Sequence, residues 1–173
     1  MKSGAESLKK SSEALNSASL WEKKKLKKKD ETTGEEKEVE DYDWNAITKA
    51  VRSFINDYNY VVEEAGESNT KSVLRNAVWM TEMTDKYSTL LAKIGITVGR
   101  GNKLELNEDS LKEAKISTLK TVFTGYNSFA EKISQKAAGI FSAANRATST
   151  YTNTGKYADM LSSMVSGRID EKA

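Results

Sequence analysis

Apolar side chains recur every three to four residues over most of this chain, the spacing that places them on one face of an α-helix. Residues 43–65 carry the clearest pattern, with Asp43 where an N-cap is expected and Gly66 at the end. The pattern therefore predicts a long helix. Its buried face is expected to contain Ile47, Val51, Phe54, Ile55, Tyr58 and Val62.

Residues 69–94 predict a second long helix, with Ser68 as a candidate cap and Gly95 as its stop. Its expected inner face contains Leu74, Ala77, Val78, Thr81, Tyr87, Leu91 and Ile94. Three more apolar residues widen this surface, namely Trp79, Met80 and Met83. Core packing explains them better than contact with a partner does.

The same spacing predicts a helix near each end of the chain. Residues 4–20 carry a narrow stripe of mostly small side chains, which favours close packing against a longer helix. This stripe consists of Ala5, Leu8, Ser12, Leu15 and Ser19. Residues 126–150 predict a long helix whose apolar side consists of Phe129, Ile133, Ala137, Ile140, Ala144 and Ala147.

Residues 96–106 alternate between apolar and polar positions, which predicts a small β-hairpin. The turn falls at residues 99–102, where two glycines and an asparagine suit a tight reversal. Asn107 is expected to cap a short helix, and Ser117 to begin another that Gly125 ends. The inward side chains of these short helices are expected to be Leu111, Ala114, Leu119, Val122 and Phe123.

Residues 21–44 separate charge by sign: six lysines lie between positions 23 and 29, and eight acids with one lysine lie between 30 and 43. One interpretation is a solvated, disordered loop. The other is a two-stranded hairpin that turns at Thr32–Gly34. If paired residue numbers sum to 65, opposite charges face each other and stabilise the hairpin. That register pairs Lys24 with Asp41, Lys25 with Glu40, Leu26 with Val39, Lys27 with Glu38, Lys29 with Glu36 and Trp21 with Trp44. A register shifted by one, with a bulge at Gly34, also mates basic with acidic residues.

Together these elements predict a mainly α fold: an elongated antiparallel bundle of long helices with a small hairpin at about 96–106 and a second, charged hairpin at about 22–43. Residues 1–147 are expected to form a single helical domain that carries residues 21–44 as an insert.

Residues 148–173 leave two interpretations open. The apolar stripe continues through Tyr151, Thr154, Ala158, Leu161 and Val165, which suits a coiled coil. Residues 148–155 are poor helix formers, however, and Gly155 favours a break. The segment is therefore either another helix or a flexible tail that orders only in an assembly.

Composition lowers the expectation of an enzyme. The 173 residues include no Cys, His or Pro, so thiol nucleophiles, disulfides and imidazole bases or metal ligands are absent. The formal net charge of +2 is also far from the basic excess of a general nucleic-acid binder. No apolar run approaches the length of a membrane span, and the first residues lack the apolar segment of a cleavable signal peptide.

Two segments carry some residues of a binding site but lack the rest of its pattern. The acidic residues 40–43 lack the alternating ligand spacing and the glycine of a calcium loop. The turn at 99–102 contains Arg100 but has neither a dinucleotide fingerprint nor a P-loop lysine. We therefore predict no catalytic, cofactor-binding or metal-binding residue, and no enzyme activity.

Three segments together resemble the helical core domain of the bacterial flagellar filament cap, the hook-associated capping protein family. AVRSFINDYNYVVEE (50–64) looks like the family's helix with a Phe, two residues and a Tyr-Asn pair, present here as Phe54 and Tyr58-Asn59. LLAKIGITVGRGNKLELNEDSLKEA (90–114) looks like its helix–hairpin–helix, and LKTVFTG (119–125) like the short helix that follows. More weakly, residues 8–21 resemble the segment before the family's large inserted domains.

The resemblance covers about residues 8–21 and 43–145, and it has two departures. The family's long β-rich inserts are replaced here by residues 21–44 alone, and its terminal coiled-coil anchors are not obvious. The chain thus looks like the core domain by itself or a reduced paralogue.

The resemblance implies a structural subunit without catalysis or cofactor. Its expected partners are copies of itself or other flagellar axial proteins such as flagellin and hook-associated proteins, rather than nucleic acid or membrane. It also implies export through the flagellar apparatus to the outside of the cell. The alternative is a non-flagellar helical adaptor or secreted interaction module that shares only the architecture, and a cytoplasmic location is the alternative to export.

Overall fold

The computed structural model describes residues 1–30, 32–147 and 164–165 of the chain. About 69% of these residues are helical. In chain order the elements are α1 (Lys2–Asn16), the 3₁₀ turn η1 (Ala18–Trp21), β1 (Lys23–Lys29), β2 (Glu36–Tyr42), α2 (Trp44–Gly66), α3 (Lys71–Ala92), β3 (Ile96–Val98), the 3₁₀ turn η2 (Arg100–Asn102), β4 (Leu104–Leu106), α4 (Glu108–Glu113), α5 (Ile116–Phe123) and α6 (Phe129–Ala147). This confirms a mainly helical chain with two small antiparallel sheets.

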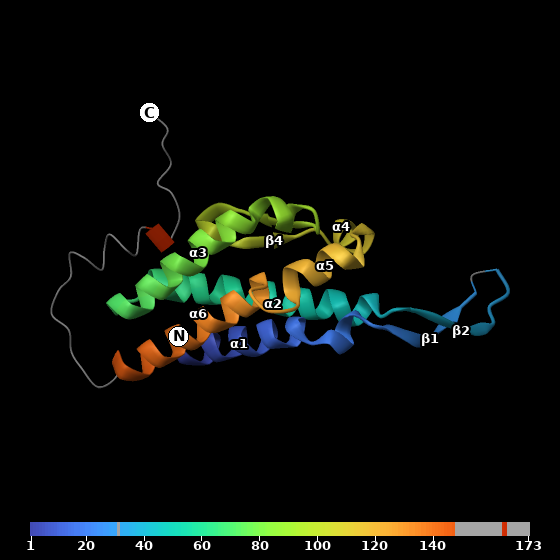
Figure 1. The fold of residues 1–173 in the computed structure, drawn as a ribbon, viewed down its shortest axis with the longest axis horizontal. Helices are drawn as coiled ribbons and strands as arrows, with labels where there is room; N and C mark the ends of the chain where they lie inside the picture. Colours follow the sequence, from blue (N-terminus) through green and yellow to red (C-terminus); the bar gives the residue numbers. More distant parts are fainter. Residues whose placement is uncertain (31, 148–163, 166–173) are drawn as a thin grey trace, which may run out of the picture.

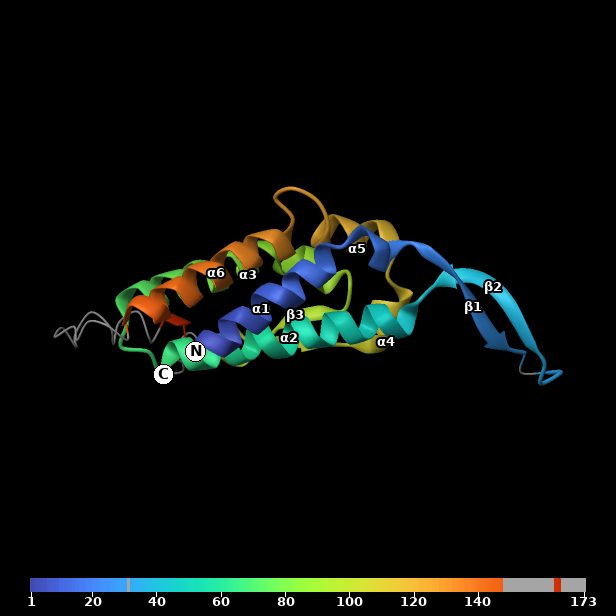
Figure 2. The same cartoon turned by 90° about the horizontal axis from the view of Figure 1, so that it is seen from below.

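The long helices pack side by side. Helix α1 contacts both α2 and α6, and α3 contacts α6 and, less extensively, α2. The β3–β4 hairpin lies against α3 and α2, whereas the β1–β2 hairpin projects beyond the helices, as Figures 1 and 2 show. Helices α4 and α5 lie at the end of the molecule from which β1–β2 projects (Figure 1).

One cluster of buried side chains joins all the helices. Its aromatic centre is Phe54, whose ring lies edge-on to Phe123 at 6.2 Å and to Phe129 at 6.0 Å between centroids. Trp21 stacks on Phe123 at 5.8 Å and donates its indole N–H to the Leu15 carbonyl at 2.8 Å. A buried Trp with its N–H satisfied fixes the exit of α1 against α5.

The predicted inner face of α2 is confirmed throughout, because all six of its apolar residues are buried. The predicted caps also hold: Asp43 Oδ1 accepts from Ala46 N, and Asn107 Oδ1 accepts from Ser110 N, both at 3.0 Å. Phe123 and Leu111 are buried as expected on the short helices.

Several predicted boundaries are wrong. Helix α1 ends at Asn16 and is followed by η1, so Ser19 lies exposed instead of on the helical stripe. Helix α3 begins at Lys71 after Thr70, because Ser68 Oγ accepts from Thr70 N within a local turn.

Helix α6 begins at Phe129 and not at residue 126. Gly125 and Asn127 adopt positive φ values of 89° and 60°, so residues 125–127 cannot be part of a right-handed helix. Ser128 then caps α6 by accepting from Glu131 N at 3.2 Å. The predicted continuation of the helix over 148–150 lies outside the described residues, as does the side chain of Ala147.

The two hairpins form with the predicted turns. In β3–β4, Ile96 pairs with Leu106 and Val98 with Leu104, and Gly99 N donates to Lys103 O at 2.7 Å. Lys103 closes the turn and is not part of β4.

In the charged hairpin β1–β2, each pair sums to 65, from Lys23 with Tyr42 to Lys29 with Glu36, which confirms the unshifted register. The disordered-loop interpretation and the shifted register are both wrong, and Gly34 (φ 72°) serves the turn. The predicted pairing of Trp21 with Trp44 is wrong as well. Trp21 turns into the core within η1, and Trp44 begins α2.

Of the predicted C-terminal stripe, Tyr151, Thr154, Ala158 and Leu161 lie outside the described residues, as does Gly155. Val165 is described and is buried. The Asn102 side-chain amide donates to the carbonyls of Met164 at 3.3 Å and Val165 at 3.0 Å, so these two residues meet the turn of the β3–β4 hairpin.

Candidate functional site

Two of the three segments that resemble the family, residues 50–64 and 90–114, meet at Asn59. This side chain points from α2 to β4, where its amide donates to the Leu104 carbonyl at 2.8 Å and its carbonyl accepts the Leu104 N–H at 2.6 Å. The Asn59 amide thus forms with Leu104 the two hydrogen bonds that a neighbouring strand would otherwise supply. Asn59 therefore attaches the small hairpin to the long helix.

Tyr58 lies one residue earlier and is fully buried. Its hydroxyl donates to Thr84 Oγ1 on α3 at 2.8 Å. Burial raises the pKa of the Tyr58 hydroxyl well above its usual range, because the phenolate would lose its hydration. A neutral, enclosed tyrosine with this partner connects two helices and offers no reactive group to a substrate.

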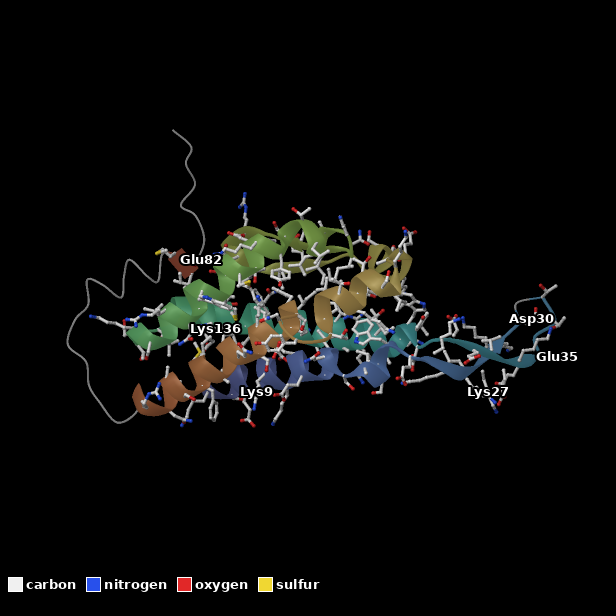
Figure 3. The ribbon with its side chains drawn as sticks, viewed as in Figure 1. Lys9, Lys27, Asp30, Glu35, Glu82 and Lys136 are labelled. Carbon is white, nitrogen blue, oxygen red and sulfur yellow. The ribbon has the colours of Figure 1, made fainter. Side chains whose placement is uncertain are left out.

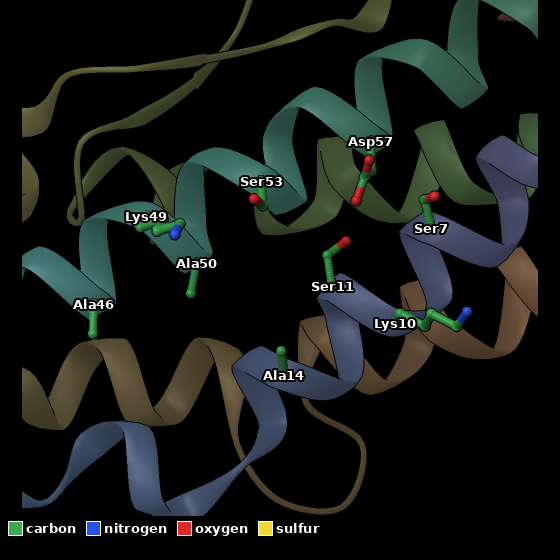
Figure 4. A pocket seen from close by; sticks show the side chains of 9 residues that line it. All are labelled: Ser7, Lys10, Ser11, Ala14, Ala46, Lys49, Ala50, Ser53 and Asp57. Carbon is green, nitrogen blue, oxygen red and sulfur yellow. The ribbon is translucent and has the colours of Figure 1, made fainter.

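A groove of about 530 Å³ lies between α1 and α2. Figure 4 shows its lining of small side chains, with Lys10, Lys49 and Asp57 around them. The small residues are Ser7, Ser11, Ala14, Ala46, Ala50 and Ser53. Ser11 Oγ donates to the Leu8 carbonyl of its own helix at 3.2 Å, and no hydrogen bond among the described residues joins it to Asp57 or Lys49. The groove thus presents an open, largely apolar surface, and its described polar side chains form no paired nucleophile and base.

A second depression of about 320 Å³ lies between α1 and α6. It is lined by Lys9, Ser12, Glu13, Asn16, Glu131, Ser134, Gln135 and Ala138. Most of these residues are polar, and four of them carry long side chains: Lys9, Glu13, Glu131 and Gln135.

The acidic residues 40–43 do not converge on a cation position. Asp43 caps α2, and Asp41 binds Lys28 Nζ at 2.6 Å while accepting from Tyr42 N at 2.7 Å. Glu40 lies opposite Lys25 in the ladder. No group of three or more metal-ligating side chains occurs in the part of the chain that the structure describes.

The turn at 99–102 is unsuited to an anion. The Glu105 carboxylate occupies the space in which a side chain at Gly99 would lie. A phosphate that approached the Gly99 backbone would therefore meet a negative charge. Arg100 lies exposed on this turn.

The charged hairpin is the most distinctive exposed surface (Figure 3). Lys28 and Lys37 face each other in the ladder, and each lysine binds an acid elsewhere: Lys28 binds Asp41, and Lys37 binds Asp30 at 3.0 Å. Asp30 also accepts from the N–H groups of Thr32 and Thr33. These hydrogen bonds and Lys37 lower the pKa of Asp30, and Lys28 together with the Tyr42 N–H lowers that of Asp41.

Sequence reasoning missed two features of these surfaces. The first is the groove, although Ser7, Ser11 and Ala14 recur at helical spacing and could have indicated it. The second is Lys136, whose ammonium lies 4.2 Å from the centroid of the Trp79 ring. This cation–π contact accounts for a half-exposed Trp on α3 without a partner protein.

No helix within the described ranges is long and apolar enough to cross a membrane. We compared the chain with protein-family models, with curated proteins and with solved structures, and none of the three comparisons gave a match.

Proposed function

We propose that this chain is a structural assembly subunit of the flagellar filament-cap type, exported from the cell and acting through helix contacts. In this proposal the long helices α1, α2, α3 and α6 form an elongated antiparallel bundle. Its partners are copies of itself or other axial proteins such as flagellin and hook-associated proteins. The chain works by binding and not by catalysis.

One observation carries the proposal: the second and third segments that resemble the family both contact the first. Phe54 of the first segment contacts Phe123 of the third, and Asn59 of the first binds Leu104 of the second. If these residues resembled the family only by chance, no direct contact between the segments would be expected. Their contact supports a shared core built around the Phe–Tyr-Asn helix.

The surfaces support a binding role as well. The groove between α1 and α2 has small side chains that allow a helix of a partner to approach its backbone closely, and exposed charges stand around it (Figure 4). Helix faces of this kind suit contacts between subunits better than they suit a small substrate.

Export tests the proposal most directly. The gene would be expressed in a flagellated bacterium with and without a working flagellar export apparatus. We expect the protein in the medium only when the apparatus works. Retention in both strains would contradict export by this route.

Binding to axial proteins is a second test. Purified chain would be mixed with purified flagellin filaments and sedimented, with Ser53→Arg in the groove and Thr89→Arg on α3 as variants of matched charge. We expect co-sedimentation that Ser53→Arg weakens and Thr89→Arg preserves. No co-sedimentation, together with a genome that lacks flagellar genes, would instead favour a non-flagellar adaptor.

A further inference from the structure

The β1–β2 hairpin has two unpaired edges. It is a two-stranded sheet, and neither strand pairs with any other described element. Asp30 N donates to Glu35 O at 2.9 Å, so residues 30 and 35 form a hydrogen-bonded pair. Because such pairs alternate along an antiparallel ladder, residues 25, 27 and 29 on β1 and 36, 38 and 40 on β2 turn their backbone polar groups outward.

The two edges carry opposite charge. Strand β1 has lysine at six of its seven positions, whereas β2 has four acids and one lysine. All these lysines and Glu36, Glu38 and Glu40 are exposed, and Figure 3 shows Lys27 projecting into solvent. Lys25, Lys27, Glu38 and Glu40 form no ion pair within 4.0 Å with any other described residue.

An exposed sheet edge ordinarily invites pairing with another chain, and edge lysines ordinarily prevent it. Here lysines would prevent β1 from pairing with β1, and acids would prevent β2 from pairing with β2, because like charges directly opposite destabilise a sheet. Only β1 against β2 of another molecule is attractive. The charges thus select one pairing out of three.

We infer that the hairpin joins copies of this chain edge to edge, with β2 of one copy antiparallel to β1 of the next. This surface lies outside the helix faces of the proposed function, and the inference does not depend on that function. The contact uses a different patch on each partner, so each copy keeps one edge free for a further copy.

The geometry of the hairpin fits this contact. In an unshifted row of hairpins, Glu38 lies opposite Lys27 of the next copy and Glu40 opposite its Lys25, as within the hairpin itself. The backbone polar groups of these four residues point outward. The register that pairs their opposite charges between copies therefore also pairs their backbone hydrogen-bonding groups. The strand twist of about 20–25° per strand rotates a hairpin two strands away by about 45°, so neighbouring helical bodies diverge with distance from the hairpins.

A nucleic acid is a poorer occupant of this surface. Residues 23–42 contain seven lysines and seven acids, so the hairpin has no net charge to attract phosphates. A second copy of the chain, in contrast, offers an acidic strand to the basic edge and a basic strand to the acidic edge.

The test measures mass by sedimentation velocity across protein concentration, at low salt and at about 1 M salt, where the screening length falls to about 3 Å. We expect the average mass to rise above that of the monomer with concentration at low salt. We expect this increase to be lost at high salt. A monomer at every concentration in low salt would overturn the inference.

A charge-swapped variant tests whether matched edges, and not the sign of either edge, govern association. Lys25→Glu, Lys27→Glu, Glu38→Lys and Glu40→Lys together keep opposite charges facing each other inside the hairpin and between copies. We expect the swapped chain to associate with itself as the wild-type chain does. Loss of self-association in this variant would overturn the selection by charge.

A backbone test completes the set. Lys27→Pro removes the outward N–H of position 27, and Lys27→Gln removes the same charge but keeps that N–H. We expect the proline variant to associate several-fold more weakly than the glutamine variant. Equal association would overturn edge pairing, and flagellin co-sedimentation measured on the same variants reports separately on the proposed function.

Discussion

Asn59 on α2 binds both backbone polar groups of Leu104 on β4, with hydrogen bonds of 2.8 and 2.6 Å. Residues 45 positions apart in sequence are thereby held in one register. The three-residue strands β3 and β4 are too short to be stable alone, so their place in the fold depends on this side chain and on the buried Ile96 and Leu104.

Removing the Asn59 amide should therefore destabilise the protein. Asn59→Ala leaves the half-buried Leu104 backbone groups without their partner, which we expect to cost about 1–3 kcal/mol in the free energy of unfolding. Urea denaturation measures the change. Asn56→Ala is the control, because it makes the same change in helix propensity at an exposed position of the same helix. It should not lower the free energy of unfolding. Equal effects of the two substitutions would contradict the assigned role of Asn59.

Gly95 should tolerate no side chain. It has φ 79°, and a Cβ there would lie 2.6 Å from Asn107 O and 2.9 Å from Leu111 N. Gly125 has φ 89° with open space around it, so Gly95→Ala and Gly125→Ala share a conformational cost of about 1–2 kcal/mol. Thermal unfolding should show a clearly larger loss for Gly95→Ala, because only this substitution also collides with backbone.

Alkaline pH should destabilise the protein through Tyr58. Its pKa is raised in the folded state above the ordinary 10.0, so the stabilisation is complete below pH 10 and is lost as pH rises above it. Tyr58→Phe removes this titration. The variant should be less stable at pH 7 by about 0.5–1.5 kcal/mol, because Thr84 loses its partner, yet its stability should vary less above pH 10. Urea midpoints at pH 7, 9 and 11 measure both effects.

Acid should weaken the tip of the charged hairpin. The pKa of Asp30 is lowered in the folded state, so its contribution is present above pH 3.8 and is lost as pH falls through the lower, folded value. The protection factor of the Thr32 amide, which is the intrinsic exchange rate at each pH divided by the rate measured by NMR, should fall on acidification. In Asp30→Asn the side-chain carbonyl accepts from Thr32 at any pH, so a strong acid dependence in this variant would contradict the assignment.

Truncating Phe123, the aromatic residue of α5, should be costly. It stacks on Trp21 and lies edge-on to Phe54, and Phe123→Ala should lower the free energy of unfolding by about 3–5 kcal/mol. Tyr126→Ala removes a ring that is 88% exposed and should change it by less than about 0.5 kcal/mol. Chemical denaturation followed by tryptophan fluorescence measures both.

Local sequence signals predicted much of this fold. Period-3.6 apolar residues identified α2, and Asp43 and Asn107 identified helix starts, because a cap depends on neighbours within one turn. Opposite charges predicted that β1 pairs with β2, but they left two registers open, because the register shifted by one also mates basic with acidic residues.

Long-range contacts could not be predicted in this way. Nothing near Trp21 in the sequence indicates that its ring stacks on Phe123. The prediction therefore paired Trp21 with Trp44, although the ladder ends at Lys23 and Tyr42. The start of α6 was missed because Asn127 adopts a positive φ, which its residue type permits but does not require. The small residues on α1 indicate one wall of the groove, but the other wall lies on α2, and the sequence does not show that the two walls meet.

The charged hairpin also makes the chain a natural scaffold for protein engineering. Lys23 and Tyr42 are paired neighbours at the base of β1–β2, and the strands beyond them bury little against the helices. Any folded module whose own ends lie about 5 Å apart could replace residues 24–41 without straining α1 or α2. The helical body would then display a foreign domain from a rigid base.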